Sequence, residues 1–229
     1  MTGSDRFQEV SRLKTTVNPI TGICMLFLIA VLVGIGGCGN SVESSQEDIE
    51  DEKTGVNGCD GQIYPETSDT PYVLPFPVGK SFTTGLTNCS SSFHGAGQPD
   101  QYAFDFNMPD DTPFTASRAG TVFQVVELAP SFGGGSGNYV VIDHGDNTFG
   151  MYLHSPQHGI IVEPGQRVEQ GDVLGLVGHS GQAGYPHLHF IVVINSPDWP
   201  YSAIPISFGN ASPLDQVLKG QTTYTATAY

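Results

Sequence analysis

Short apolar segments broken by glycine and proline run through most of this sequence, and they limit the fold more than any other feature. The 229 residues include 29 glycines and 16 prolines, and neither residue suits the interior of a helix. A helical bundle needs long stretches without them, so an all-α fold is excluded. The pattern instead predicts an all-β protein, a compact antiparallel β-sheet with long loops and glycine at its turns.

The expected strands are short apolar runs bounded by turn residues, as in a sheet that closes on itself. A later run, residues 204–208, has the pattern of an edge strand. The other candidates are residues 120–128, 138–143, 148–154, 173–177 and 187–194.

The N-terminus has the layout of an export signal. A basic segment precedes an apolar run over residues 20–35, which is shorter than the roughly 20 residues that a membrane-spanning helix needs. The run ends in Ile35-Gly36-Gly37-Cys38, which resembles the lipobox of bacterial lipoproteins. That resemblance implies a signal peptide over residues 1–37 and a lipid anchor on Cys38. An uncleaved membrane anchor and an ordinary secretory signal are the alternatives.

Acidic residues greatly outnumber basic ones. The formal charge is −15, with 23 Asp and Glu against 8 Lys and Arg, which excludes a nucleic-acid partner because phosphate binding needs a basic surface. Residues 38–70 are acidic and poor in large apolar side chains, so they predict a flexible tether. We therefore expect a signal peptide (1–37), a tether (38–70), a folded domain (71–210) and a polar C-terminal tail (211–229).

Besides the lipid-bearing Cys38, two cysteines remain in the expected mature protein, Cys59 and Cys89. In an oxidising compartment outside the cytoplasm such a pair predicts a disulfide, which would close a loop of about 30 residues. Two free thiols are the alternative.

The seven histidines all lie between residues 94 and 189, and the sharpest pattern among them is the segment 187–190 (HLHF). Residues two apart in a strand share a face, so His187 and His189 point the same way, as a metal site on a rigid strand requires. Ordinary core or surface histidines are the alternative. Asp105 stands between two phenylalanines, where a carboxylate is costly unless it is paired or bound to a metal.

A series of segments in one order makes the sequence similar to the M23 family of zinc metallopeptidases, the LytM or lysostaphin-like peptidoglycan endopeptidases. The resemblance covers residues 93–193, most of the expected domain, and it implies a barrel-sandwich-like LytM fold. The segments are 93–95 (FHG), 102–106 (YAFDF), 108–109 (MP) with 112–114 (TPF), 119–122 (AGTV), 141–145 (VIDHG), 151–154 (MYLH), 162–171 (VEPGQRVEQG) and 178–190.

This resemblance implies a role for each of five residues around one Zn²⁺ ion. His189, Asp105 and an upstream histidine would be the zinc ligands, and His154 and His187 would flank the water that zinc activates. A set of two histidines and one aspartate suits catalytic zinc, which lowers the pKa of its water to near 7. Of the other histidines, His144 would be structural, and His158 and His179 would lie in exposed loops.

The upstream ligand is where this sequence departs from the commonest family pattern. That pattern places the first ligand four residues before the aspartate, and this position is Gln101. A neutral carboxamide is a poor zinc ligand beside imidazole. His94 lies eleven residues before Asp105, after which a glycine-containing stretch can loop back. We therefore assign His94 as the third ligand.

The resemblance implies a zinc-dependent endopeptidase that cuts peptide cross-links of bacterial peptidoglycan. The alternative is a catalytically inactive LytM-like module that binds cell wall and activates a separate amidase. We expect a monomer in the bacterial cell envelope, attached to a membrane through Cys38. Gly39 after that cysteine, by resemblance to lipoproteins without Asp there, favours the periplasmic face of the outer membrane.

Overall fold

A computed structural model describes residues 58–130, 133 and 135–229. The expected signal peptide, the lipidation site Cys38 and most of the acidic tether lie outside the described residues. Within the described ranges, no helix has the length and apolar character needed to cross a membrane. This part of the chain holds one short 3₁₀ helix, η1 (Ser92–His94), and otherwise consists of strands and loops.

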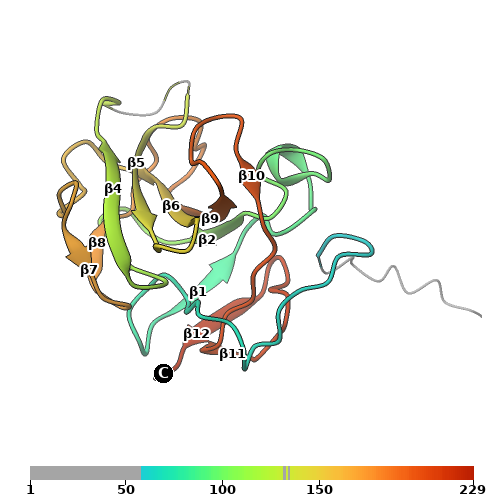
Figure 1. The fold of residues 1–229 in the computed structure, drawn as a ribbon. Helices are drawn as coiled ribbons and strands as arrows, with labels where there is room; N and C mark the ends of the chain where they lie inside the picture. The colour runs from blue at the N-terminus through green and yellow to red at the C-terminus, as the bar shows by residue number, and fades with distance from the viewer. Residues whose placement is uncertain (1–57, 131–132, 134) are drawn as a thin grey trace, which may run out of the picture. The chain divides into compact units, whose positions relative to one another are not determined.

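The strands form one large antiparallel sheet and one small sheet (Figure 1). The described residues contain β1 (Ser81–Thr84), β2 (Phe104–Asn107), β3 (Pro113–Thr115), β4 (Gly120–Val126), β5 (Asn138–Asp143), β6 (Thr148–Ser155), β7 (Arg167–Val168), β8 (Val173–Leu176), β9 (Leu188–Ile194), β10 (Ser202–Ala203), β11 (Ala211–Ser212) and β12 (Thr223–Ala226). The large sheet has the order β11-β12-β1-β2-β9-β6-β5-β4-β7, with β10 also paired to β9, and the small sheet joins β3 and β8. The predicted all-β, antiparallel fold is confirmed.

Strand β9 is central to the large sheet and is buried on both faces. It pairs with β2 on one side and with β6 on the other. Leu188 and Phe190 point into the larger hydrophobic core, whereas Ile191 and Val193 belong to a second cluster on the opposite face. Burial of both faces explains why the sequence of β9 is almost continuously apolar. The strand is therefore a rigid support for the side chains that it carries.

The five main predicted strands are all present, and their ends differ from the prediction by no more than two residues. The segment 204–208 is not a strand, although Ile206 and Phe208 are buried in the larger core. Pro205 lies just before them and has no N–H to donate to a sheet, so the pairing with β9 does not continue past the Ile204 N–H, which bonds to the carbonyl of Val192.

The C-terminal residues differ from the expected polar tail. Strand β12 pairs with both β1 and β11, and Figure 1 shows these red strands beside β1. Tyr224 on β12 and Leu218 just before it are buried in the larger core. Side chains alternate between faces along a strand, so even the polar sequence TYTA buries every second residue. Residues 211–226 therefore contribute structure to the folded domain.

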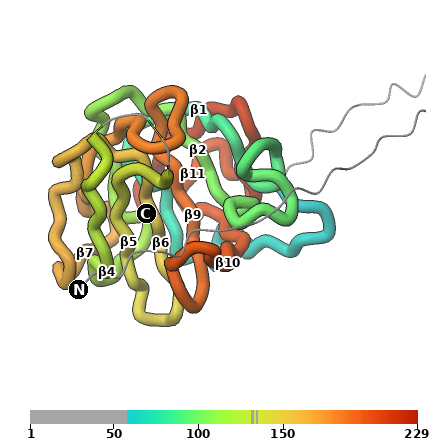
Figure 2. Tube along the Cα trace, turned by 90° about the horizontal axis from the view of Figure 1, so that it is seen from above, coloured from blue at the N-terminus to red at the C-terminus, as the bar shows by residue number. Residues whose placement is uncertain are grey.

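The folded part also begins earlier than the expected residue 71. Cys59 and Cys89 are joined by a disulfide with their Cα atoms 5.0 Å apart. Tyr64 is buried and meets the ring of Tyr102 edge-on, with centroids 6.4 Å apart. In Figure 2 this cyan segment runs beside the green loop that precedes β2. Residues 58–70 are thus packed against the domain and are not part of a tether.

Candidate metal centre

Asp105 and His189 lie opposite one another on neighbouring strands, β2 and β9. They are register partners, so their side chains extend from the same face of the sheet. Oδ1 of Asp105 lies 3.0 Å from Nδ1 of His189, and both residues are buried. The backbone ladder therefore fixes a carboxylate and an imidazole side by side.

His94 approaches the same carboxylate from the loop before β2, where it ends helix η1. Its Nε2 lies 3.4 Å from Oδ1 of Asp105, and its ring meets the ring of His189 edge-on with centroids 5.1 Å apart. One ligand atom from each of these three residues lies within 4.8 Å of the other two. His94 and Asp105 are therefore close in space although they are eleven residues apart in the sequence.

Gln101, which occupies the commonest family ligand position, has other partners. Its side-chain Oε1 accepts a hydrogen bond of 2.8 Å from the backbone N–H of Gly97. Its backbone carbonyl accepts a second, also 2.8 Å, from the N–H of Cys89. Both contacts hold the loop between His94 and β2 in a folded-back form, which is how His94 reaches Asp105.

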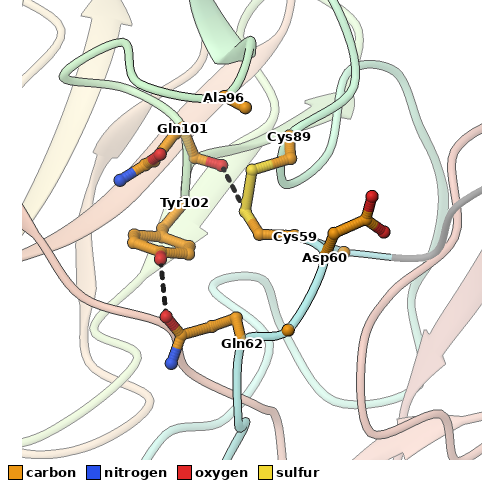
Figure 3. Close-up of a pocket in the computed structure, with 9 residues that line it drawn as sticks. Cys59, Asp60, Gln62, Cys89, Ala96, Gln101 and Tyr102 are labelled. Atoms are coloured by element: carbon orange, nitrogen blue, oxygen red, sulfur yellow. Dashed lines mark hydrogen bonds between the residues drawn. A yellow bond between two sulfur atoms is a disulfide. The ribbon is translucent and has the colours of Figure 1, made fainter.

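A cavity of about 370 Å³ lies beside this loop, against the disulfide (Figure 3). On its wall, the hydroxyl of Tyr102 donates a 2.8 Å hydrogen bond to Oε1 of Gln62. The residues that line the cavity include none of the five predicted metal-site residues. The cavity is therefore separate from the buried group of histidines.

A second group of imidazoles shares His189 with the first. His154, His187 and His189 each offer one ring nitrogen within 4.8 Å of the others. The rings of His154 and His187 have centroids 4.8 Å apart, and Nε2 of His187 lies 3.6 Å from Oδ1 of Asp105. All five residues singled out by the sequence thus meet at one place, and all are buried.

An irregularity in β6 directs His154 toward this place. The register of β5 with β6 shifts there, because Asn138 is opposite Ser155 while Tyr139 is opposite Leu153. His154 therefore has no register partner on β5. Its φ of 75° lies in the left-handed region that a bulky residue rarely adopts. Such bulges turn a side chain away from its regular direction and are common beside functional sites.

Backbone carbonyls fix the orientation of both flanking imidazoles. Nδ1 of His154 lies 2.8 Å from the carbonyl oxygen of Ser180, and Nδ1 of His187 lies 2.9 Å from that of Tyr185. A carbonyl only accepts hydrogen bonds, so each Nδ1 must carry a proton. In a neutral ring this leaves Nε2 of both histidines unprotonated and able to accept a proton.

Close backbone contact holds the Ser180 carbonyl in place. A Cβ added to Gly137 would come within 2.5 Å of that carbonyl oxygen, and one added to Gly181 would come within 2.4 Å of Gly137 N. The Ser180 hydroxyl also donates a 2.6 Å hydrogen bond to the carbonyl of Ser155. Any side chain at either glycine would displace the group that orients His154.

Burial and neighbouring charges give these residues unusual pKa values. Burial raises the pKa of Asp105, but hydrogen bonds from His189 and His94 outweigh it and hold the pKa well below its usual range. Burial lowers the pKa of His189, yet the carboxylates of Asp100 and Asp105 raise it to about 9. Burial, with the nearby His189 and His187, lowers the pKa of His154 to about 3. Burial also lowers the pKa of His187. These shifts favour an ionised Asp105 beside two neutral imidazoles, His154 and His187.

The donor set of His94, Asp105 and His189 fits zinc. Two ligand atoms about 2.0–2.1 Å from one tetrahedral zinc ion lie roughly 3.3 Å apart, and the two distances to Oδ1 of Asp105 are 3.4 and 3.0 Å. Two imidazoles and one carboxylate are also the donor types that catalytic zinc sites use while keeping a fourth position open. These three residues could hold the ion without a change of ligand type.

The remaining three histidines lie outside this group. Nδ1 of His144 is 3.1 Å from the carbonyl of Ala119. His158 is exposed. His179 is also exposed and pairs with Asp110 at 2.9 Å. Neither of the two groups that could hold a metal ion within the described residues includes any of the three.

Comparison with known proteins gives one family and several relatives. Residues 100–199 match the model of Peptidase family M23. The peptidoglycan DD-endopeptidases ShyA and ShyC of Vibrio cholerae are 38% and 36% identical over 90 and 91 residues, about 40% of this chain. These matches span only 19% of each relative's own length. A solved catalytic domain of a variant of the prophage-encoded M23 protein EnpA from Enterococcus faecalis is 24% identical. It covers 58% of this chain and 94% of that one, with a TM-score of 0.47.

The antiparallel all-β sheet carries a buried aspartate and four buried histidines close together, and this group could hold a metal ion. The match to the family model includes β2, β6 and β9, the strands that carry Asp105, His154 and His189. Residues 100–199 are therefore similar to Peptidase family M23 over the part of the chain that carries these three residues. His94 and the disulfide lie before the matched residues, so their place in the site comes from the geometry described above.

Sequence reasoning did not single out the groups that orient the imidazoles. The carbonyls of Ser180 and Tyr185 are backbone atoms, and any residue type supplies a carbonyl. Asp100 lies close to His189, but it is one of several acidic residues near the loop and has no motif of its own. Asp100 comes close to His189 because the loop before β2 lies beside β9 in the folded protein.

Proposed function

We propose that this protein is a zinc-dependent metalloendopeptidase that hydrolyses peptide cross-links of bacterial peptidoglycan. The observation that carries the proposal is the meeting of two groups at His189: a ligand set of His94, Asp105 and His189, and a pair of neutral imidazoles, His154 and His187. Metal ligands and proton-transfer groups within hydrogen-bond reach of one point are what peptide hydrolysis by a metalloenzyme requires.

Zinc would supply Lewis acidity there and would bring the pKa of a water molecule close to 7. The side chains around it divide the remaining work. His154 and His187 each present an unprotonated Nε2, so either can accept the proton that water loses as it attacks the peptide carbonyl. The same imidazoles, once protonated, can donate a hydrogen bond to the oxyanion that forms. Their fixed Nδ1 contacts prevent the rings from turning during this exchange.

Support for the substrate class comes from the relatives. Both Vibrio cholerae proteins are described as peptidoglycan DD-endopeptidases, and each is similar to about 40% of this chain. The N-terminal pattern that ends at Cys38 supports a lipid-anchored protein of the bacterial envelope, on the periplasmic face of the outer membrane. A disulfide between Cys59 and Cys89 suits the same oxidising compartment.

Digestion of isolated bacterial sacculi tests the proposal. Full-length protein, purified in detergent and loaded with zinc, should convert cross-linked muropeptides into uncross-linked ones, as measured by liquid chromatography and mass spectrometry. Activity should disappear with a zinc chelator and with His187→Ala, because that change removes one proton acceptor. The masses of the products also identify the bond that is cut.

His179→Ala is the matched control, since it removes an exposed histidine from outside the metal centre. It should digest sacculi as the unmodified protein does. If zinc-loaded protein leaves sacculi intact and His187→Ala stimulates a cell-wall amidase as well as the unmodified protein, the endopeptidase proposal is wrong. That result would instead support an amidase-activating module.

A further inference from the structure

The second ring nitrogen of His189 faces away from the ligand group. Nδ1 of His189 is the atom directed at Asp105, and Nε2 is buried without a hydrogen-bond partner among the described residues. Oδ1 of Asp100 lies 3.8 Å from this Nε2. A bridging water would need two hydrogen bonds of about 2.8 Å each, so the gap leaves little room for one. The two groups therefore face each other directly.

Asp100 is itself held by a neighbouring side chain. The hydroxyl of Tyr201, which lies next to β10, donates a hydrogen bond to the same oxygen, Oδ1. Burial and the Asp100 charge raise the pKa of Tyr201, so the hydroxyl keeps its proton and remains a donor. The Asp100 carboxylate is only 16% exposed. Tyr201 thus fixes a carboxylate at the outer edge of the His189 ring.

We propose that Asp100, held by Tyr201, positions His189 for metal binding by accepting the proton of Nε2. A proton kept on Nε2 leaves the lone pair of Nδ1 free for the ion, and a carboxylate partner makes the imidazole a stronger ligand. The proposal rests on the role of His189 as a metal ligand in the proposed function. It adds a residue that the ligand set alone does not include.

Asp100 cannot itself be a further ligand of the same ion. The two nitrogens of an imidazole point to opposite sides of the ring, and Asp100 is on the side of Nε2 whereas Asp105 is on the side of Nδ1. Neither metal-binding group found in the described residues contains Asp100. Its action is therefore through His189, as a positioning residue.

Two measurements on the full-length protein test the proposal. Zinc affinity, measured by competition with a chromophoric chelator, should fall about 10- to 100-fold in Asp100→Asn, the usual cost of losing an outer partner of a ligand. Proton NMR should show a downfield, exchange-protected Nε2–H signal of His189 in metal-free and zinc-loaded protein. That signal should shift upfield or disappear in Asp100→Asn, and Tyr201→Phe should change both readouts in the same direction by less.

Asp110→Asn is the matched control, because Asp110 forms a similar pair with exposed His179 far from any ligand role. It should leave both measurements unchanged. An unchanged zinc affinity and an unchanged His189 signal in Asp100→Asn would overturn the positioning role. Thermal melting of each metal-free variant excludes a folding defect, and if Asp100→Asn does not fold, Tyr201→Phe decides by the same readouts. A normal His189 signal in unmodified protein that binds no zinc would contradict the proposed function while leaving the Asp100 contact supported.

Discussion

Asp105 and His189 are cross-strand partners on β2 and β9, with 3.0 Å between Oδ1 and Nδ1. The distance between these two prospective ligands is set by the hydrogen-bond ladder of the sheet and not by a loop. His94 then adds a third donor atom from a short helical turn. A loop with one short helical turn therefore supplies one of these three residues, while two paired strands supply the other two.

His94 is expected to be essential for metal binding. His94→Ala should lower zinc affinity by more than the about 10- to 100-fold that loss of an outer partner costs, because it removes a donor atom from the ion itself. Isothermal titration or chelator competition measures the change. Gln101→Ala is the informative comparison, since it alters the commonest family ligand position. If that variant loses zinc and His94→Ala retains it, the ligand assignment is reversed.

The Cys59–Cys89 disulfide is expected to stabilise the fold through the chain that it closes. The two cysteines are 30 residues apart, and in the chain-entropy model a loop of this size contributes roughly 3–4 kcal/mol. The double variant Cys59→Ser/Cys89→Ser should lose about that much free energy of unfolding in urea titrations. Reduction of the unmodified protein should reproduce the loss, and a midpoint insensitive to both changes would contradict the prediction.

The C-terminal region is expected to behave as part of the hydrophobic core. Leu218 is 1% exposed, so Leu218→Ala should reduce the free energy of unfolding by about 2–5 kcal/mol through lost burial and a new cavity. Leu214 is 61% exposed, and Leu214→Ala should change it by no more than about 0.5 kcal/mol. Equal effects of the two changes in chemical denaturation would place residues 211–229 outside the cooperative unit.

The turn before β6 is expected to give a small acid-sensitive contribution to stability. Burial raises the pKa of Asp146, but hydrogen bonds from Thr148 and Arg118 outweigh it and lower the pKa to about 2. Since the folded protein favours the ionised form, this contribution is complete above pH 4 and is lost as the pH falls toward 2. The Asp146 side chain is 47% exposed, so solvent screening limits the effect to about 1 kcal/mol or less.

Denaturation of the unmodified protein and Asp146→Asn at pH 5 and pH 2.5 measures this contribution. The asparagine retains an acceptor for the Thr148 contacts but has no charge, so its stability should fall less over this interval. Added salt should reduce the difference between the two proteins. A pH dependence that is the same in both would show that Asp146 does not contribute.

Much of the fold and the central site could be predicted because the relevant signals are local. The two histidines of HLHF share a face by the geometry of any strand, and the apolar runs between glycines locate the main strands to within two residues. Asp105 stands out because an isolated carboxylate between two phenylalanines needs a partner. For these residues, the neighbouring sequence already contains the physical constraint.

The remaining features depend on which segments meet in space. The polar sequence of β12 resembles a tail until its pairing with β1 shows that Tyr224 points into the core. Asp100 lies beside Nε2 of His189 only because β9 and the loop before β2 meet in space. Similarly, the direction of His154 depends on a register shift that has no composition signal in β6.

The central position of β9 has a consequence for how the site is lost on heating. Both edges of β9 are paired, so His189 cannot leave its place until the pairings with β2 and β6 separate. Amide hydrogens in such a strand exchange with solvent mainly through the largest opening events of a domain. The Asp105–His189 pair should therefore persist up to the temperature at which the whole sheet opens, and its loss should coincide with unfolding instead of preceding it.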